Sequence, residues 1–250
     1  MSYDSSAEMF ALWEQYNQVR TSGFKKQANQ ILNTFLECFK KQTVEVRATF
    51  VENLCTELLD RFSSSPNDFW LSTNGTDVSG LPIRIQFPLF RDAVLPELLG
   101  RFNAGDAKAT RWLGQLGQFF YCDKRLWKLT CEELDLPWPE TNTSFFFEKS
   151  YAINKDQITL QFIVSMYLGS LEYDCHEIPY GLLCEPEEMN RTVAESRDYW
   201  RQLDPSELKD KWNEQLIEYE RIAFCWDDYI THKFLYDDFY DYMIKNNIKW

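Results

Sequence analysis

The densest cluster of chemically reactive side chains in this chain is the run from Tyr173 to Glu177. A histidine beside carboxylates could transfer protons as a general acid or base, or bind a metal ion. Neighbouring residues on a helix point in different directions, so we expect neither Asp174 nor Glu177 to share a face with His176. The zinc-binding pattern His-Glu-x-x-His is not completed, because Tyr180 stands where the second histidine belongs. One interpretation of these residues is an enzyme centred on Asp174, His176 and Glu177. The other is purely structural: the helix dipole favours a histidine at a helix C-terminus.

Other catalytic patterns do not occur in the sequence. His232 is the second of two histidines, and no local motif pairs either one with any of the seven cysteines as a nucleophile. Glycine-rich phosphate loops and the Gly-x-Ser-x-Gly turn of hydrolases are missing. The pair Asp237-Asp238 lacks the spaced ligands and the glycine of a calcium loop. The sequence therefore predicts no catalytic residue, no metal site and no cofactor.

Carboxylates alternate with aromatic side chains near the C-terminal end of the chain. In a protein-binding surface, aromatic rings anchor the partner and charged groups select it. The alternative is an ordinary helix whose acidic residues lie on its solvated side. The predicted partner-binding residues are Trp226, Asp227, Asp228, Tyr229, Asp237, Asp238, Tyr240 and Asp241.

The net charge of −13, from 26 basic and 39 acidic residues, bears on the kind of partner. An acidic surface repels phosphate backbones and anionic membranes, so we expect neither nucleic-acid nor membrane binding. Such a surface attracts a basic protein and helps to determine which partners are accepted. The acidity could also serve solubility alone.

The cysteines and the N-terminus favour a cytoplasmic protein. The seven cysteines are odd in number and form no Cys-x-x-Cys pair, as is usual for thiols in a reducing compartment. The first ten residues carry acids where a secretory signal would carry bases. No apolar run approaches the roughly 20 residues that span a bilayer. We therefore expect a cytoplasmic protein.

Hydrophobic spacing predicts three amphipathic helices in residues 1–62. Ser5 with Glu8 forms a capping box before the first helix, and Thr43 can cap the third. Residues 63–86 interrupt this pattern with Ser, Pro, Asn-Gly and Gly. Within this irregular insertion, the alternation of Ile83, Ile85 and Phe87 with polar residues suggests a short strand.

Helical patterns resume after the insertion and continue to the C-terminus. Pro96 should start or kink a helix, and Asp106 can cap the next one. Thr130 is expected to cap a short turn that ends at residues 136–139, and further helix starts are expected at Asn154 with Gln157, at Pro186 and at Asp204.

The most regular apolar stripe lies near the C-terminus, and a break near Thr231-His232 is expected to end its helix. Its spacing of 4-4-3-4-3-4 is close to that of a coiled coil, so it could also join two copies of the chain as a homodimer. The stripe consists of Leu208, Trp212, Leu216, Tyr219, Ala223, Trp226 and Ile230.

These patterns together predict an all-α fold, either an antiparallel multi-helix bundle or a short array of helical hairpins, with one irregular insertion. The expected organisation is an N-terminal three-helix segment at 1–62, the insertion at 63–86 and a main helical domain at 87–250. One continuous domain over 1–250 is the alternative.

Two stretches resemble helical bacterial proteins. The first runs from Phe90 to Gly114, and the second runs from Tyr173 to Leu183 and includes His176-Glu177-Ile178-Pro179. In size, acidity and helical content the chain is similar to immunity proteins of bacterial polymorphic toxin systems. The resemblance implies a non-enzymatic protein that neutralises a basic cognate toxin, and it carries over no catalytic residue. A helical adapter or scaffold that binds peptides or partner helices is the second hypothesis.

Overall fold

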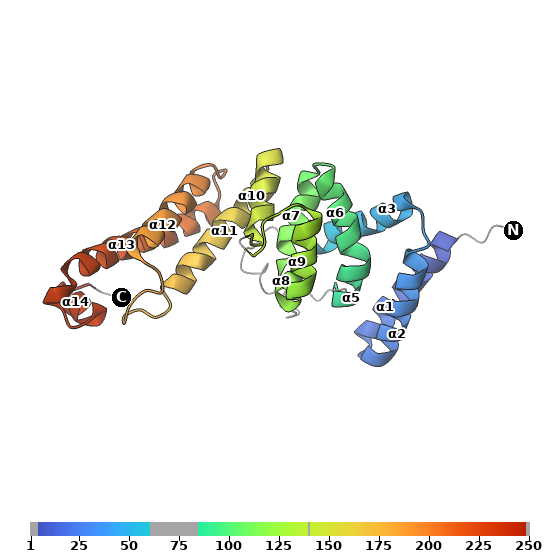
Figure 1. Ribbon diagram of the computed structural model, residues 1–250, viewed down its shortest axis with the longest axis horizontal. Coiled ribbons are helices and arrows are strands. Elements are labelled where there is room, and N and C mark those ends of the chain that lie inside the picture. The colour runs from blue at the N-terminus through green and yellow to red at the C-terminus, as the bar shows by residue number, and fades with distance from the viewer. Residues whose placement is uncertain (1–4, 61–84, 140, 249–250) are drawn as a thin grey trace. The chain divides into compact units, whose positions relative to one another are not determined.

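The computed structural model describes residues 5–60, 85–139 and 141–248. Every regular element in these ranges is a helix, which confirms the all-α class (Figure 1). The chain divides into two compact units, which we call the first unit (residues 1–154) and the second unit (residues 155–250). No helix of the described ranges is long and apolar enough to cross a membrane.

The first unit contains a series of mostly short helices. Its elements are α1 (Ser5–Thr21), α2 (Lys25–Phe39), α3 (Val44–Cys55), the π-helical turn η1 (Thr56–Asp60), α5 (Phe87–Leu89), the π-helical turn η2 (Phe90–Val94), α6 (Leu95–Asn103), α7 (Ala107–Gln115), α8 (Gly117–Cys122), α9 (Lys124–Glu133) and α10 (Ser144–Ile153). Helices α1 and α2 form a hairpin, and α7 packs against both α6 and α10.

One aromatic-rich core runs through the first unit. It extends from Met9 in α1 to Phe146 in α10, and Phe50 in α3 belongs to the same buried cluster as Phe90 and Trp112. Residues before and after the predicted insertion therefore share one core. The chain does not divide at 63–86 but at 154/155, because apolar side chains from both sides of the insertion are buried together.

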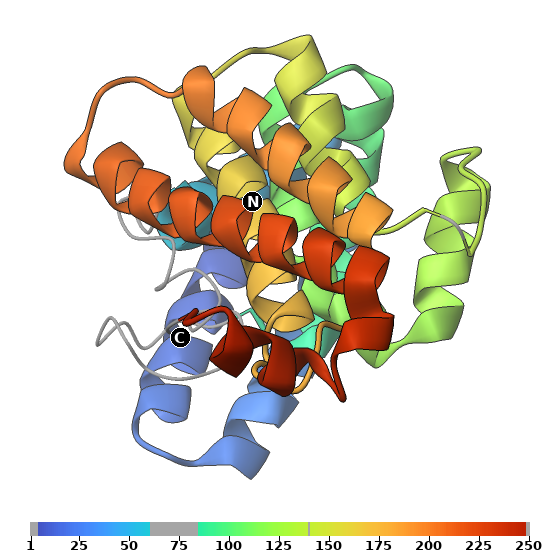
Figure 2. The ribbon, with the colours of Figure 1, turned by 90° about the vertical axis from the view of Figure 1, so that its left-hand side faces the viewer.

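The second unit is built on three long helices. Its elements are α11 (Gln157–Asp174), α12 (Pro186–Arg201), α13 (Glu207–His232), the 3₁₀ turn η3 (Lys233–Leu235) and α14 (Phe239–Lys245). Helix α12 packs against α11 and α13, and Figure 2 shows α14 turned back beside the C-terminal end of α13. Trp212, Leu216 and Ala223 of the predicted coiled-coil stripe are buried within this unit. That stripe therefore stabilises the chain's own fold.

Several local signals place helix ends where the sequence predicts them. The side chain of Thr43 accepts a hydrogen bond from the Val46 backbone N–H, and Asp106 accepts one from Ala109. Pro96 and Pro186 lie in the first turns of α6 and α12. Helix α13 ends at His232, at the expected break. Helix α1 begins at Ser5, whose side chain lies outside the described residues.

Three predicted caps are wrong. Thr130 was expected to cap a short turn, but it is buried inside α9, a helix that Asp123 caps. Helix α11 is capped by Asp156, two residues after the predicted Asn154. Helix α13 is capped by Ser206 in place of Asp204, again a shift of two residues. In each case the actual cap directly precedes the first helical residue, where its oxygen reaches the N–H groups of the first turn.

The predicted strand is not observed in its described part. Ile83 lies outside the described residues, and Phe87 opens the short helix α5. Pro88 follows at once, and proline lacks the N–H that a ladder needs but fits the first turn of a helix.

Candidate functional site

The predicted partner-binding residues lie on the end of α13 and on α14, and two of them point inward. Trp226 and Tyr229 pack on Phe239, with ring centroids 5.1 and 5.3 Å from the Phe239 ring. Trp226 Nε1 also donates a hydrogen bond of 3.2 Å to the backbone carbonyl of Cys184. These two rings therefore hold α13, α14 and the loop before α12 together.

Asp228 connects α13 to α14. Its carboxylate accepts a hydrogen bond of 2.9 Å from the Tyr242 hydroxyl and lies 3.1 Å from Nδ1 of His232. Burial and the hydrogen bond to Asp228 raise the pKa of Tyr242 above its usual value. Asp228 is thus a structural residue at the edge of the surface.

Two other predicted acids organise the start of α14. Asp238 caps this helix by accepting a hydrogen bond of 2.7 Å from the Asp241 backbone N–H. The Asp241 carboxylate accepts hydrogen bonds from Lys245 Nζ at 2.7 Å and from the Asp237 backbone N–H at 3.1 Å. These bonds hold the pKa of Asp241 below its usual value.

Four of the predicted residues face solvent, among them the cap residue Asp238. Asp227, Asp237, Asp238 and Tyr240 are all exposed. The ring of Tyr240, 48% exposed, lies 6.3 Å from that of Tyr180, which is 74% exposed in the loop between α11 and α12. Tyr180 was not predicted for this surface, because it lies about sixty residues away in sequence. The structure thus places an exposed pair of tyrosines beside the acidic start of α14.

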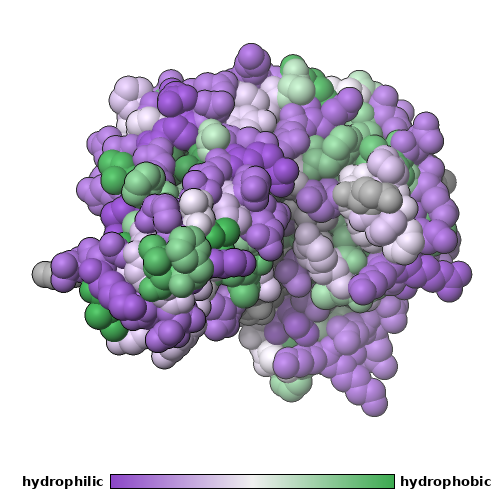
Figure 3. All heavy atoms as spheres, turned by 60° about the vertical axis from the view of Figure 1, so that its left-hand side comes forward, coloured by the Kyte–Doolittle hydropathy of each residue, from purple (hydrophilic) through white to green (hydrophobic). Residues whose placement is uncertain are grey.

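Further apolar side chains are exposed on the same unit. Ile217 and Phe224 lie on α13, Phe234 and Leu235 in η3, and Ile244 on α14. Ile217 and Phe224 were not predicted as surface residues, because the inward apolar stripe of α13 is the more regular pattern in the sequence. On the face of the molecule in Figure 3, hydrophobic residues form small separate groups among hydrophilic ones.

Negative charge is concentrated in the second unit. Residues 155–250 contain 20 acidic and 10 basic side chains, a net charge of −10. Residues 1–154 contain 19 acidic and 16 basic side chains, a net charge of −3. Since a local excess of one charge sets the potential over the neighbouring surface, the second unit carries the stronger negative potential of the two.

The alternative polar cluster is only partly assembled. Nδ1 of His176 donates to the Tyr173 carbonyl at 2.8 Å, and its Nε2 lies 2.9 Å from the Glu177 carboxylate. The expectation that His176 and Glu177 do not meet is wrong, because α11 ends at Asp174 and both residues lie in the following turn. Asp174 instead hydrogen-bonds the Cys184 side chain, and burial raises its pKa. The three groups therefore do not converge on one point.

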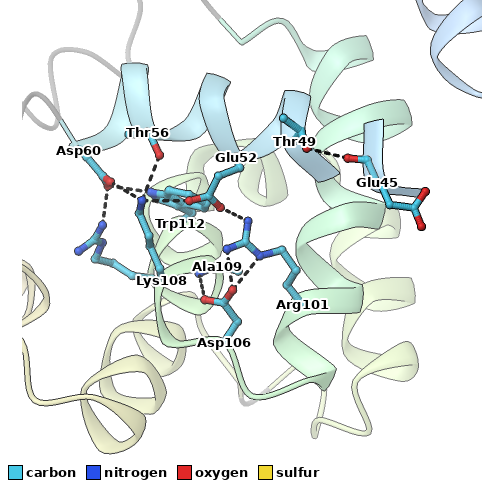
Figure 4. A network of polar contacts seen from close by, with 11 residues as sticks. Glu45, Thr49, Glu52, Thr56, Asp60, Arg101, Asp106, Lys108, Ala109 and Trp112 are labelled. Carbon is cyan, nitrogen blue, oxygen red and sulfur yellow. Dashed lines mark hydrogen bonds and ion pairs between the residues drawn. The ribbon is translucent and has the colours of Figure 1, made fainter. Parts of the chain in front are cut away.

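A second polar cluster, which sequence analysis missed, lies in the first unit (Figure 4). Lys108 Nζ lies 3.1 Å from carboxylate oxygens of both Glu52 and Asp60, and 4.7 Å from the centre of the Trp112 ring. Trp112 Nε1 donates to Asp60 at 2.9 Å. The ion pairs of Arg101 with Glu52 and Asp106, and of Arg111 with Asp60, complete the network.

This network fastens α3 and η1 to α6 and α7. Burial lowers the pKa of Lys108, but its hydrogen bonds to Asp60 and Glu52 outweigh that effect and raise the pKa. Three acids and three bases balance one another, so the groups satisfy each other's charge. The arrangement is suited to stabilising the first unit.

No protein-family model, no curated protein and no solved structure matches this chain. Among the described residues, no group of three or more His, Cys, Asp or Glu side chains is placed to hold a metal ion. Negative charge and exposed large apolar side chains are both denser in the second unit than in the first.

Proposed function

We propose that this chain is a non-enzymatic binding protein whose second unit recognises a basic protein partner. The observation that supports this most is the charge of the second unit, with 20 acidic against 10 basic side chains. Complementary charge speeds the encounter of two proteins and disfavours wrong partners. A surface of this sign attracts a cationic partner.

The exposed rings beside the acids would supply affinity. Tyr180 and Tyr240 lie in mutual contact next to Asp237 and Asp238. Tyrosine offers a large, rigid contact area at a low entropic cost, and rings at interface centres contribute most of the binding energy. In this proposal the tyrosines anchor the partner and the surrounding carboxylates select it.

The most concrete form of the proposal is a cytoplasmic immunity protein that neutralises a cognate bacterial toxin. Enzymes that attack nucleic acids carry basic side chains where they bind the phosphate backbone. An acidic protein can cover such a site by charge complementarity. The resemblance to immunity proteins supports this form, and an odd number of cysteines without a Cys-x-x-Cys pair fits a reducing compartment.

Co-expression with the product of the adjacent gene tests the proposal. We expect the two proteins to purify together, the complex to weaken as salt is raised, and the chain to protect cells from that product. The variant with Asp227→Lys and Asp237→Lys, two exposed acids, changes the net charge of the second unit from −10 to −6 and should bind more weakly. Absence of a complex together with absence of protection would overturn the immunity function.

A further inference from the structure

Helix α13 carries an exposed apolar ridge on the side away from its buried residues. Ile217 and Phe224 are 53% and 73% exposed, whereas Leu216 and Ala223 are buried. Residues seven apart lie two turns apart on the same side of a helix, so Ile217 and Phe224 share one face, with the charged residues Glu220 and Arg221 between them. We call these two residues, together with the residues three or four positions from either of them, the outer face of α13.

Acidic residues surround this ridge. Side chains three or four residues away are neighbours on a helix surface, and four of the six such positions are acidic whereas one is basic. The one base, Arg221, is bonded to Glu218 at 2.5 Å, so its charge is balanced locally. Of the four acids, Glu220 pairs with Arg197 at 2.8 Å and Asp228 bonds Tyr242 and His232, so Glu214 and Asp227 supply most of the surplus negative charge beside the two apolar side chains. The six neighbours are Asn213, Glu214, Glu220, Arg221, Asp227 and Asp228.

We propose that the outer face of α13 binds a basic amphipathic helix of the protein partner. The inference rests on the proposed function and identifies which part of the partner protein binds the second unit. Helix α13 has 26 residues, about 39 Å at 1.5 Å per residue. An apolar ridge of this kind packs against the apolar side of a second helix, whose lysines and arginines would then reach the flanking acids.

Charge selects this occupant over the other candidates. A second copy of the chain would bring another unit of net charge −10 against the same acids, which disfavours a homodimer through this face. Phosphate backbones and anionic membranes are repelled for the same reason. A cationic helix gains from both the apolar ridge and the carboxylates.

The experiment uses the full chain and a synthetic peptide of about 18 residues, or five turns, with leucine on one side and lysine on the other. A peptide of the same composition with scrambled order, and a leucine-glutamate version, serve as controls. Binding is measured by fluorescence anisotropy. We expect the leucine-lysine peptide to bind and become helical, the scrambled peptide to bind more weakly, and the leucine-glutamate peptide not to bind.

Two variants of the chain test whether the peptide binds at the outer face of α13. The double variant Ile217→Ser with Phe224→Ser should weaken peptide binding about tenfold or more, because truncating central apolar anchors removes most of the affinity. Phe234→Ser changes an equally exposed ring in η3, 79% exposed, and should leave binding unchanged. Circular dichroism and thermal melting show that each variant is folded.

The inference would be overturned if the chain did not bind the leucine-lysine peptide, or if the double variant bound it as tightly as the wild type. A dimer in light scattering that the double variant abolished would show that a second copy covers the face instead. If the adjacent gene product still bound the double variant at full strength, the proposed function would stand and only its location on α13 would fail.

Discussion

The hydroxyl of Tyr242 on α14 donates a 2.9 Å hydrogen bond to the carboxylate of Asp228 on α13. Tyr242 is buried, whereas Asp228 is partly exposed at the edge of the acidic surface. This contact is the direct polar link between the candidate site and the aromatic cluster beneath it, formed with Phe239 and Tyr229. Its removal is therefore a test of how rigidly α14 is held.

Tyr242→Phe is expected to destabilise the second unit by about 1 to 2 kcal/mol, since a hydrogen bond to a charged group is lost while ring packing is kept. Urea unfolding followed by tryptophan fluorescence measures this. Tyr240→Phe, at an exposed ring of the same helix, is the control and should leave the unfolding midpoint unchanged. Equal midpoints for Tyr242→Phe and wild type would show that the bond contributes nothing.

Alkaline pH should weaken the second unit. Burial raises the pKa of Cys175 and of Cys184 to about 12, and burial followed by the nearby Cys175 raises that of Tyr219 to about 12. A raised pKa in the folded state contributes stability below the unfolded pKa, and that stability is lost as pH rises through the folded pKa. The loss should begin near pH 9 for the thiols and near pH 10 for Tyr219.

The urea midpoint measured from pH 8 to pH 12 checks this expectation. Cys175→Ala and Tyr219→Phe each remove one of the titrating groups, so each variant should show a shallower fall than the wild type. A pH dependence that is the same in all three proteins would contradict the assignment to these groups.

Asp106 should stabilise the folded protein in two ways that can be measured separately, as a helix cap and as an ion-pair partner. Its carboxylate caps α7 and binds Arg101, and these bonds outweigh burial and hold its pKa below the usual value. Asp106→Ala should cost about 1 to 2 kcal/mol through the lost cap alone. Asp106→Asn keeps an acceptor for the cap and loses the ion pair, so it should cost less.

Thermal melting as a function of pH separates the two effects. A depressed carboxyl pKa contributes stability above the unfolded pKa, near 3.8, and that stability is lost as pH falls through the folded pKa. Both variants should therefore lose less stability than the wild type below pH 4. An Asp106→Asn variant as unstable as Asp106→Ala would assign the whole effect to the charge.

Gly114 and Gly100 should respond in opposite directions to alanine. A Cβ on Gly114 would lie 2.9 Å from ring carbons of Phe147, whereas a Cβ on Gly100 would meet nothing within 4 Å. Gly114→Ala should therefore destabilise by about 1 to 3 kcal/mol through overpacking. Gly100→Ala should stabilise α6 by about 0.5 to 1 kcal/mol, because alanine loses less backbone entropy. Urea midpoints of the two variants check both signs.

Trp226 and Tyr240 were both predicted to bind a partner, and the structure separates their roles. Trp226→Ala should destabilise the second unit by about 3 kcal/mol or more, since it removes a ring packed on Phe239. Tyr240→Ala should change stability by less than about 0.5 kcal/mol and should weaken partner binding. Loss of binding by Trp226→Ala with unchanged stability would mean that Trp226 faces the partner.

Local features of this protein could be predicted from the sequence because they depend on neighbouring residues. The helical class follows from apolar spacing, and Pro96, Pro186, Thr43 and Asp106 mark helix starts that the structure confirms. The errors at Asn154 and Asp204 have a local cause as well. Two polar residues stood near each helix start, and spacing alone did not show which one the backbone places directly before the first turn.

Sequence by itself thus determined the helices, the acidity and the aromatic content of this chain. Only the tertiary structure decided that Trp226 is turned inward, that Tyr180 meets Tyr240, and that Lys108 joins Glu52 to Asp60. The reason is physical: helix periodicity specifies which side chains share a stripe, but not which other element buries that stripe. Burial against a distant segment determines whether a ring belongs to the core or remains available to a partner.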